Sequence, residues 1–397
     1  MISSRKDTYT KLQGQTSPFP FLIDVDYAKG NYIYDKSGKA FLDLIAGVAV
    51  NNIGHNHPEV VKAIKKQVDR HLHVMVYGEF IQDAQLEMAK KLTSLLPEKL
   101  NCVYTLNSGT EAIEAAIKLA KRVTDRSEII SCYGAYHGST NGALSISANE
   151  SKKTAFRPLM PNIRFIKHNY LSDLDKITQK TAAVFIEPIQ GDAGVRIASK
   201  KYLTALRKKC DETQTLLVFD EIQCGMGRTG KLFAFNHYGV VPDILTLGKA
   251  LGGGMPIGAL VSHFNLLQQF TEKPMLGHIT TFGGHPVVCA AANACLNVLQ
   301  AVKWNEVERK GERLAEIINQ SNEVREIRRI GMMFAIDMET SERVEKVVKK
   351  CLEMGLITFW FLSHPHSFRL SPPLFISDKE VELAGKKILE AIEQTKN

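Results

Sequence analysis

The sequence lacks the features that mark membrane, secreted and metal-binding proteins. No apolar run approaches the length of a membrane span, and the residues after Met1 contain no apolar core of a signal peptide. The seven cysteines are dispersed, with no pair at the spacing of zinc ligands. These absences predict a soluble, cytoplasmic protein with free thiols, no membrane partner and no bound metal.

Basic residues are in excess but are not concentrated. The formal net charge is +8, yet there is no basic arm and no basic stripe interleaved with aromatic side chains. Short clusters such as Arg207–Lys209 lie in helical patterns, where they are typical of a solvated face. We therefore expect no nucleic-acid partner, whereas the charge is compatible with anionic metabolites as substrates.

The order of strand-like and helical patterns predicts the fold class. From residue 101 onward, helical patterns alternate with strand-like segments at 102–106, 128–131, 163–167, 182–186, 215–219 and 244–247. Such alternation is typical of parallel strands joined by helical crossovers, so we expect a three-layer α/β domain with a mainly parallel central sheet. Functional groups of such a domain gather at the carboxyl ends of its strands.

A chain of 397 residues is long enough for two domains. Residues 1–45 contain two strand-like pieces around a turn, and we expect this segment to join the smaller domain. Residues 46–300 are expected to form the large domain. In residues 301–397 two strand patterns lie among helical ones, which predicts a small α+β domain at the C-terminus.

Leu245–Gly258 is the most informative stretch, because it delivers one lysine from an apolar segment into a glycine-dense turn. Glycines at this density indicate a backbone that passes close to a bulky ligand. A lysine in a partly dry pocket can lose its charge and attack a carbonyl to form an imine. Lys249 is therefore a candidate catalytic residue; the alternative is a surface lysine before a flexible loop.

Asp220 follows four apolar residues, which places it at the carboxyl edge of a predicted strand. A partly buried carboxylate there needs a cation or a hydrogen-bond donor as its partner. A protonated pyridine nitrogen would supply one, and the pair would keep that ring cationic. Because Asp220 and Lys249 follow successive predicted strands, we expect them at the same edge of the sheet. The alternative for Asp220 is helix capping or a salt bridge.

Three further segments follow predicted strands. Asn107–Glu114 begins a helix with small hydroxyl residues and a glycine, whose free N–H groups and helix dipole form a ready phosphate site. Simple capping by Ser108 or Thr110 is the alternative. Tyr136 could stack on a planar ligand, although ordinary packing is the default for an aromatic side chain. Glu187 ends another strand and is followed at once by a proline.

These groups together indicate a site for pyridoxal 5'-phosphate. They would provide a phosphate site, an imine-forming lysine, a carboxylate for a pyridinium and a stacking aromatic. The cofactor stabilises the carbanion that is left when the α-proton of a bound amine departs. Lys249, once released by exchange with the substrate amine, can serve as the base that moves this proton.

Gly225–Gly230 matches G-x-G-x-x-G, the pattern of dinucleotide-binding sites. That pattern requires a helix directly after the glycines and an acidic residue about 20 residues further on. Here an aromatic segment broken by Gly239 and Pro242 follows, and the acidic Asp243 comes too early. We interpret these glycines as a loop, so a nicotinamide oxidoreductase is the disfavoured alternative from another class.

From about Gly30 to its end, the chain resembles the class III (acetylornithine/ornithine/4-aminobutyrate-type) aminotransferases of fold type I. The resemblance rests on specific motifs, namely NSGTEA at 107, GAYHG at 134, EPIQG at 187, DEIQCGMGRTG at 220, the lysine segment, and TTFGGHP at 280. It implies an enzyme that moves an amino group from an ornithine-, acylornithine-, lysine- or 4-aminobutyrate-like donor to a 2-oxo acid, with 2-oxoglutarate expected as acceptor. A pyridoxal phosphate-dependent aminomutase or amino-acid racemase/epimerase is the alternative within the same chemistry.

The resemblance also assigns the cofactor contacts. Lys249 would carry the internal aldimine, and Asp220 would pair with the pyridine nitrogen. The remaining cofactor residues implied by the motifs are Gln223 at the ring hydroxyl, Ile222 and Tyr136 on opposite ring faces, His137 and Glu187 in the pocket, and Ser108, Gly109 and Thr110 at the phosphate.

Substrate and subunit contacts are implied in the same way. Thr281 would reach the phosphate of the neighbouring subunit, which implies a homodimer with shared active sites. Arg369 matches the arginine that binds the carboxylate of 2-oxoglutarate or glutamate, and a planar guanidinium suits that task; a structural arginine at the domain boundary is the alternative. Two positions depart from the family pattern: Ser139 replaces an arginine that binds a substrate carboxylate, and Asp192 replaces a glutamate. Both changes concern substrate recognition, so the amine donor stays open.

Overall fold

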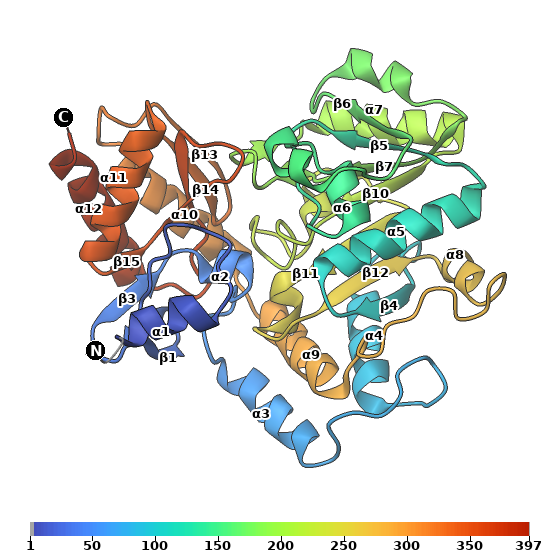
Figure 1. Cartoon of the computed structure of the whole chain (residues 1–397), viewed down its shortest axis with the longest axis horizontal. Coiled ribbons are helices and arrows are strands. Elements are labelled where there is room, and N and C mark those ends of the chain that lie inside the picture. The colour runs from blue at the N-terminus through green and yellow to red at the C-terminus, as the bar shows by residue number, and fades with distance from the viewer. Residues whose placement is uncertain (1–3, 397) are drawn as a thin grey trace.

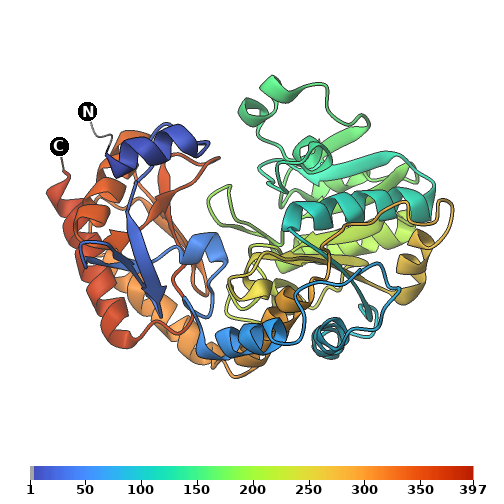
Figure 2. The same cartoon turned by 60° about the horizontal axis from the view of Figure 1, so that its bottom comes forward.

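The computed structural model describes residues 4–396, so what we expected of residues 1–3 and 397 lies outside the described part of the chain. Figures 1 and 2 show two lobes, with the N-terminal and C-terminal elements together in one and the middle of the chain in the other. The larger lobe is built on a seven-stranded sheet. Helices cover both faces of this sheet, which gives the three layers that the sequence predicts.

The strands of the large sheet lie in the order β4 (Cys102–Leu106), β12 (Gly258–Ser262), β11 (Ile244–Gly248), β10 (Leu216–Asp220), β7 (Thr181–Ile186), β5 (Glu128–Cys132) and β6 (Ile163–Ile166). Only β12 runs antiparallel to its neighbours. The mainly parallel sheet is therefore confirmed. Strand β12 was not predicted, because its five residues follow the glycine-dense turn directly and could not be distinguished from it.

Helix α5 (Gly109–Thr124) packs on one face of the sheet through a stripe of small and aliphatic residues spaced by three and four. Its fully buried members include Ala112, Ile113, Ala116, Ile117 and Ala120. The opposite face is covered by α4 (Asp83–Ser94), α7 (Lys200–Thr213) and α9 (Pro286–Gln300), whose apolar residues join the main core. Helix α3 (Pro58–Val68) packs against α9, and α6 (Asn141–Ile146) and α8 (Phe264–Leu267) lie beside α5.

The smaller lobe contains two four-stranded sheets. One has the order β13 (Glu326–Ile330), β14 (Met333–Asp337), β17 (Ser367–Leu370) and β16 (Phe359–Trp360), and α10 (Trp304–Ile318), α11 (Ser341–Glu353) and α12 (Asp378–Gln394) pack around it. The other joins β1 (Val25–Lys29), β2 (Tyr32–Asp35) and β3 (Ala40–Asp43) to β15 (Leu356–Ile357). Strand β3 pairs with β15 in parallel, so the N-terminal segment is hydrogen-bonded to the C-terminal part. Division into domains at residues 45 and 300 stays a prediction.

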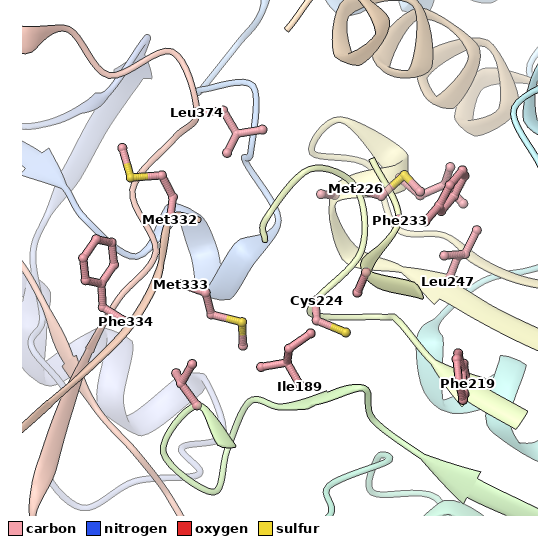
Figure 3. Close-up of a cluster of buried hydrophobic side chains, with 14 of the residues drawn as sticks. Ile189, Phe219, Cys224, Met226, Phe233, Leu247, Met332, Met333, Phe334 and Leu374 are labelled. Atoms are coloured by element: carbon pink, nitrogen blue, oxygen red, sulfur yellow. The ribbon is translucent and has the colours of Figure 1, made fainter. Parts of the chain in front are cut away.

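Buried side chains connect the two lobes. Figure 3 shows Met333 of β14 beside Ile189 and Cys224 of the larger lobe, and these side chains belong to one apolar cluster. The fully buried Arg228 adds polar connections: its Nη1 donates to the carbonyl oxygens of Met332 at 2.9 Å and Pro372 at 2.6 Å. Burial lowers the pKa of Arg228 to about 9. A continuous core of this kind fixes how the lobes face each other.

Ala46–Ala49 (α2) form a left-handed turn where the chain passes from the N-terminal strands to the larger lobe. Their φ angles lie between +48° and +62°, including the β-branched Val48 at +62°. A left-handed residue other than glycine costs about 1–2 kcal/mol, so this turn is held by its surroundings. Asp43 caps it by accepting hydrogen bonds from the backbone N–H groups of Ile45 and Ala46 at 2.8 and 3.0 Å.

Within residues 4–396, no single helix is long and apolar enough to cross a membrane. The pair α9 and α10 passes such a test only when the two are joined across an 80° bend.

Candidate active site

Adjacent parallel strands bring Asp220 and Lys249 to one edge of the sheet. Strands β10 and β11 pair in register, with Asp220 opposite Thr246, and Lys249 follows directly after the end of β11. Both residues therefore lie at the carboxyl ends of neighbouring strands, as the sequence predicts. The short turn η5 (Lys249–Gly252) is buried under α9, where the Cys295 thiol donates to the carbonyl oxygen of Ala250 at 3.1 Å.

Both carboxylate oxygens of Asp220 have partners. The backbone N–H of Ile222 donates to Oδ1 at 3.0 Å, and Nδ1 of His137 lies 2.7 Å from Oδ2. Burial alone would lower the pKa of His137, but the hydrogen bond and negative charge of Asp220 hold that pKa above its ordinary value. The contact with His137 thus fixes the orientation of the Asp220 carboxylate, in a residue that is only 4% exposed.

Lys249 has the backbone conformation and surroundings of a functional residue. Its φ is +44°, a left-handed value that a lysine adopts only under constraint. Burial lowers the pKa of the Lys249 amine, while the charges of Asp220 and Glu187 oppose this shift. Within the described residues, no group forms a hydrogen bond or ion pair with this amine. A partly buried, unpartnered amine is the group that the sequence predicts for covalent chemistry.

Glu187 organises the two loops beside this lysine. Its Oε1 accepts a hydrogen bond from the backbone N–H of Tyr136 at 3.0 Å, and its Oε2 accepts one from the N–H of Gly191 at 3.0 Å. Burial raises the pKa of Glu187 to about 7, a shift that His137 opposes and Asp220 reinforces. Glu187 therefore holds the Tyr136 segment against the turn that follows β7. The Tyr136 ring itself is exposed, so it is free to contact a ligand.

The beginning of α5 has the predicted form of an anion site. Ser108 is the N-cap of this 16-residue helix, and its hydroxyl accepts a hydrogen bond from the N–H of Glu111 at 3.3 Å. A Cβ added to Gly109 would lie 2.8 Å from the Ile222 side chain, so only glycine fits there. The hydroxyl of Thr110 lies 2.7 Å from that of Thr140. Ser108 therefore does cap the helix, and the hydroxyls of Thr110 and Thr140 lie side by side at its positive end.

Arg369 lies on β17 and reaches the larger lobe. Its Nη2 donates to Oδ1 of Asp192 at 2.8 Å, and its guanidinium lies 4.3 Å from the centre of the Phe361 ring. Both members of the ion pair are buried, and the Nε of Arg369 has no hydrogen-bond partner. Burial lowers the pKa of Arg369, although Asp192 and Glu187 oppose the shift.

For Gln223, Ser139 and Thr281, the structure gives a position but no contact that indicates the predicted role. Gln223 packs against Gly191, where an added Cβ would overlap the glutamine amide. Ser139 is exposed beside the Thr110 and Thr140 hydroxyls and carries no charge. Thr281 is also exposed, in a segment with several exposed apolar side chains. The proposed roles of these three residues stay predictions.

Sequence reasoning missed three features of this site. The Thr140 hydroxyl lies beside that of Thr110, Ala49 of the 46–49 turn lines the same small cavity as Arg369, and residues 361–363 contact the Arg369–Asp192 pair. Only the 46–49 turn had a usable signal, the glycine at 47. The other two depend on contacts between distant parts of the chain, which periodicity does not reveal.

The glycines at 225–230 form consecutive turns, as expected, rather than the loop and helix of a dinucleotide site. They are closely packed: a Cβ on Gly225 would lie 2.7 Å from the carbonyl oxygen of Glu221, and one on Gly227 would lie 2.7 Å from Leu374. Gly225 and Gly227 are buried, and turns take the place of the helix start that a dinucleotide phosphate requires, so residues 225–230 do not have the form of a nicotinamide site.

Comparisons with known proteins agree with this geometry. A family model described as aminotransferase class-III matches residues 14–392. The chain is 41% identical to the acetylornithine aminotransferase of Methanocaldococcus jannaschii over 367 residues, which cover 89% of each chain. It is 35% identical to the [LysW]-aminoadipate semialdehyde/glutamate semialdehyde transaminase of Sulfurisphaera tokodaii over 381 residues, covering 93% of this chain and 94% of the relative.

A solved structure adds the cofactor. The chain superposes on the ornithine aminotransferase of Toxoplasma gondii, a structure described as having pyridoxal phosphate at partial occupancy in its active site. The TM-score is 0.89 at 30% identity, with 97% of this chain and 92% of that chain covered. The match extends over both lobes, so it includes the whole of the candidate site.

Proposed function

Because the chain belongs to the class-III aminotransferases, which are pyridoxal phosphate enzymes of amino-acid metabolism, we propose that it moves the terminal amino group of an acylornithine- or ornithine-like donor to 2-oxoglutarate. One observation supports this proposal most strongly. The Lys249 amine has no partner among the described residues, and it lies close enough to the buried carboxylate of Asp220 and to the buried guanidinium of Arg369 for both charges to act on its pKa. The first two suit the cofactor, and the third suits a substrate carboxylate.

The residues present fit pyridoxal phosphate. The Lys249 amine has no partner among the described residues and so is available to an aldehyde. The start of α5 offers backbone N–H groups and the hydroxyl of Thr110 to a phosphate, and Gly109 lets the Ile222 side chain pack against this helix start. Asp220 is held by two hydrogen bonds in a position where a pyridinium would complete its neutralisation.

When bound, the cofactor supplies an aldehyde for the amine and an electron-withdrawing ring that acidifies the α-hydrogen of the substrate. Lys249 has the role of general base, because burial favours its neutral form and the turn after β11 holds it at the sheet edge. Asp220 preserves a negative charge for the ring nitrogen, and His137 keeps Asp220 oriented. Tyr136 and Ile222 are proposed to flank the ring, with Gln223 near its hydroxyl. Glu187 positions the Tyr136 segment.

The substrate part of the proposal rests on Arg369. A dicarboxylic oxo acid needs a cation for the carboxylate far from the reacting carbon, and the unpaired Nε of Arg369 is a donor without an acceptor. Asp192 already pairs with this guanidinium, so a carboxylate must compete with it. Ser139 offers a hydroxyl but no charge, which leaves Arg369 as the proposed cation for the carboxylates of donor and acceptor alike.

A panel of amines tests the proposal directly. The holoenzyme would be mixed with ornithine, N-acetylornithine, lysine, 4-aminobutyrate or a diamine, and the cofactor absorbance followed in a single turnover. An active donor converts the cofactor to its amino form, and 2-oxoglutarate then restores the starting spectrum. Conversion without restoration by any 2-oxo acid would contradict the transferase. Formation of an isomer of the donor, without net amino loss, would instead establish the aminomutase or epimerase alternative.

A second copy of this chain is the partner that we propose for the larger lobe. Residues 76–79 and 275–283 contribute to one cavity, and exposed apolar side chains gather in and beside these two segments. They are Leu72, Val74, Met75, Phe80, Ile81, Met275, Leu276, Ile279 and Phe282. An exposed apolar surface of this extent is typical of an interface. Thr281 lies within it, where it would reach the site of the partner. The cytoplasmic location stays a prediction.

Sedimentation analysis tests the homodimer. Ile81, which is 93% exposed, would be replaced by glutamate, and the dimer should dissociate at micromolar concentration. Leu12→Glu is the matched control, because Leu12 is 82% exposed but lies on α1 (Arg5–Leu12), away from this surface. A monomeric wild-type enzyme with full activity would refute the shared site.

A further inference from the structure

Asp192 is held in its position beside Arg369 by more than the ion pair. Its Oδ1 accepts hydrogen bonds from Nη2 of Arg369 at 2.8 Å and from the backbone N–H of Leu362 at 3.2 Å. Its Oδ2 accepts one from the hydroxyl of Ser363 at 2.6 Å. The Asp192 side chain is only 7% exposed, so its contacts are with protein rather than with water. All three hydrogen bonds belong to the one position in which Asp192 neutralises Arg369.

Residues 361–363 contact both members of this pair. The Phe361 ring lies against the face of the Arg369 guanidinium at 4.3 Å, and the next two residues supply the N–H and the hydroxyl that bind Asp192. This 361–363 segment connects β16 to the chain before β17, so it belongs to the smaller lobe. Asp192 belongs to the larger lobe. The segment therefore joins the two lobes at the point where a substrate carboxylate is proposed to bind.

Ser363 also accepts a hydrogen bond from Asn149, a residue of the larger lobe that follows the Tyr136 segment in the chain. The side-chain amide of Asn149 donates to the Ser363 hydroxyl at 3.0 Å, while the amide oxygen of Asn149 accepts from the N–H and hydroxyl of Ser151 at 3.1 and 2.7 Å. These contacts fix which end of the amide faces Ser363. The neighbouring Ala148 donates its N–H to the carbonyl oxygen of Ala135 at 3.0 Å, next to Tyr136. A chain of hydrogen bonds thus runs from the Tyr136 segment to Arg369.

We propose that Ser363 is a specificity-determining positioning residue, which holds Asp192 on Arg369 and so sets how readily a substrate dicarboxylate gains access to the guanidinium. Asn149 supports Ser363 in this role. A carboxylate that takes the Nη2 of Arg369 must displace Asp192 from it, and displacement breaks every hydrogen bond formed only in the paired position. Each such bond therefore weakens dicarboxylate binding by its own contribution. The inference rests on the proposed carboxylate-binding role of Arg369.

The short side chain of Asp192 determines how strongly it competes with a substrate carboxylate for Arg369. An aspartate at 192 reaches Arg369 with one oxygen and leaves the other for Ser363, so Arg369 keeps an unpaired Nε. A carboxylate that enters meets a guanidinium that is partly satisfied and partly free. Dicarboxylates should therefore bind, but less tightly than they would to an unopposed arginine, and the difference should be set by Ser363 and Asn149.

Calorimetry with glutarate tests this inference, because glutarate has both carboxylates of the proposed acceptor but no group that reacts. It would be titrated into holoenzyme of the wild type and of Ser363→Ala. Loss of one hydrogen bond to the Asp192 carboxylate should lower the Kd of glutarate about fivefold. Asn149→Ala, which removes only the support of the hydroxyl, should lower it about twofold. Ser363→Thr keeps the hydroxyl and should restore the wild-type value.

The Arg369→Met background separates the two proposals. Glutarate should bind weakly to Arg369→Met, and adding Ser363→Ala should then change nothing, because the competition no longer exists. If Arg369→Met binds glutarate like the wild type, the proposed function loses its carboxylate site. If it binds poorly but Ser363→Ala alone leaves the glutarate Kd unchanged or raises it, only the role of Ser363 is overturned.

Two further measurements in the glutarate titrations control for misfolding and for nonspecific effects of removing a hydroxyl group. Ser94→Ala removes a hydroxyl that bonds only to the carbonyl oxygen of Lys91 on an exposed helix end, and it should leave the glutarate Kd unaltered. Should Ser363→Ala fail to fold, Asn149→Ala provides the same sign of change from outside the segment. A glutarate Kd that does not fall in Asn149→Ala would then overturn the inference.

Discussion

The cofactor side and the substrate side of this site hold their charges in different ways. On the cofactor side, Asp220 and His137 form a buried pair within the larger lobe, supported by the backbone of the same β10 strand end. On the substrate side, Arg369 and Asp192 come from different lobes and meet only because the lobes pack together. The first arrangement depends on one sheet, whereas the second depends on the relation between two lobes.

This difference between the two charged pairs indicates which part of the site can be altered by substitution without effect on the other part. The orientation of Asp220 is set by its hydrogen bonds to His137 and to the N–H of Ile222, so a change there should disturb the proposed cofactor site. The Arg369–Asp192 pair is bounded by the 361–363 segment, whose hydrogen bonds to this site, among the described residues, go to Asp192 and not to Asp220 or Lys249. If the proposed roles hold, substitutions in the 361–363 segment should change substrate preference and leave the cofactor chemistry intact. The following substitutions test that separation.

Lys249→Ala should have the largest effect. Removal of the amine takes away the proposed base and the covalent partner of the cofactor, so turnover should fall by at least about 10⁴-fold. The exposed Lys180→Ala is the control and should retain full activity. Steady-state rates with the best donor provide the measurement, and a variant that keeps more than a few per cent of the rate would contradict the role of Lys249.

Asp220→Asn should come next. The amide keeps the shape of the side chain but removes the charge proposed to stabilise a pyridinium, so kcat should fall by about 10²–10³-fold. The KM for the dicarboxylic acceptor should hardly change, because Arg369 is untouched. Asp175→Asn, at a side chain that is 90% exposed, serves as the control. If Asp220→Asn raised the KM for the acceptor and left kcat unchanged, the proposed separation of the cofactor side from the substrate side would be wrong.

His137→Asn should destabilise the protein by about 3 kcal/mol, because it leaves the Asp220 carboxylate buried without its partner. The pKa of His137 is raised above its reference of 6.5, so the stabilisation is complete below that pH and is lost as pH rises through the higher folded value. The wild type should therefore lose its advantage over the variant as pH rises. Thermal unfolding of both proteins between pH 6 and 9 measures this, and parallel profiles would contradict it.

Arg369→Met should change only the substrate side. The KM for 2-oxoglutarate should rise about 30-fold, equivalent to about 2 kcal/mol for a buried charge pair with one partner removed. The rate of the first half-reaction with a donor that lacks a carboxylate, such as a diamine, should stay within about twofold. Arg309→Met, at an exposed ion pair, is the control. An equal loss in both half-reactions would mean that Arg369 is structural.

Ser108→Ala should have the smallest effect. Loss of this N-cap should cost about 1 kcal/mol of stability and weaken cofactor retention slightly. Ser4→Ala removes the cap of α1, which buries no residue, and should leave the melting temperature of the whole protein unchanged. Differential scanning calorimetry compares the two. A loss of several kcal/mol in Ser108→Ala would mean that the hydroxyl does more than cap the helix.

The cofactor side was more predictable from sequence than the substrate side. Asp220 and Lys249 each end an apolar strand, and consecutive parallel strands place their ends together, so periodicity alone brings these residues to one edge. The helix start at Ser108 carries its own local signal. The fold class, the helices of the smaller lobe and most strands were accessible for the same reason: each depends on a local pattern.

The remaining features depend on contacts that no local pattern encodes. Ser363 and Asp192 are 171 residues apart and meet through the packing of the lobes. Strand β15, which pairs with β3, is only two residues long and shows no alternation. The left-handed turn at Ala46–Ala49 occurs in residues that favour other conformations, so it reflects constraint by Asp43 and the core.

Covalent mapping of the cofactor tests the central claim most directly. The holoenzyme would be treated with borohydride to fix any carbon–nitrogen double bond, digested, and its peptides weighed by mass spectrometry. We predict one modified peptide, which contains Lys249 and carries the added mass of the reduced cofactor. Attachment at any other lysine, or no attachment at all in an enzyme that turns over, would contradict this account of the site.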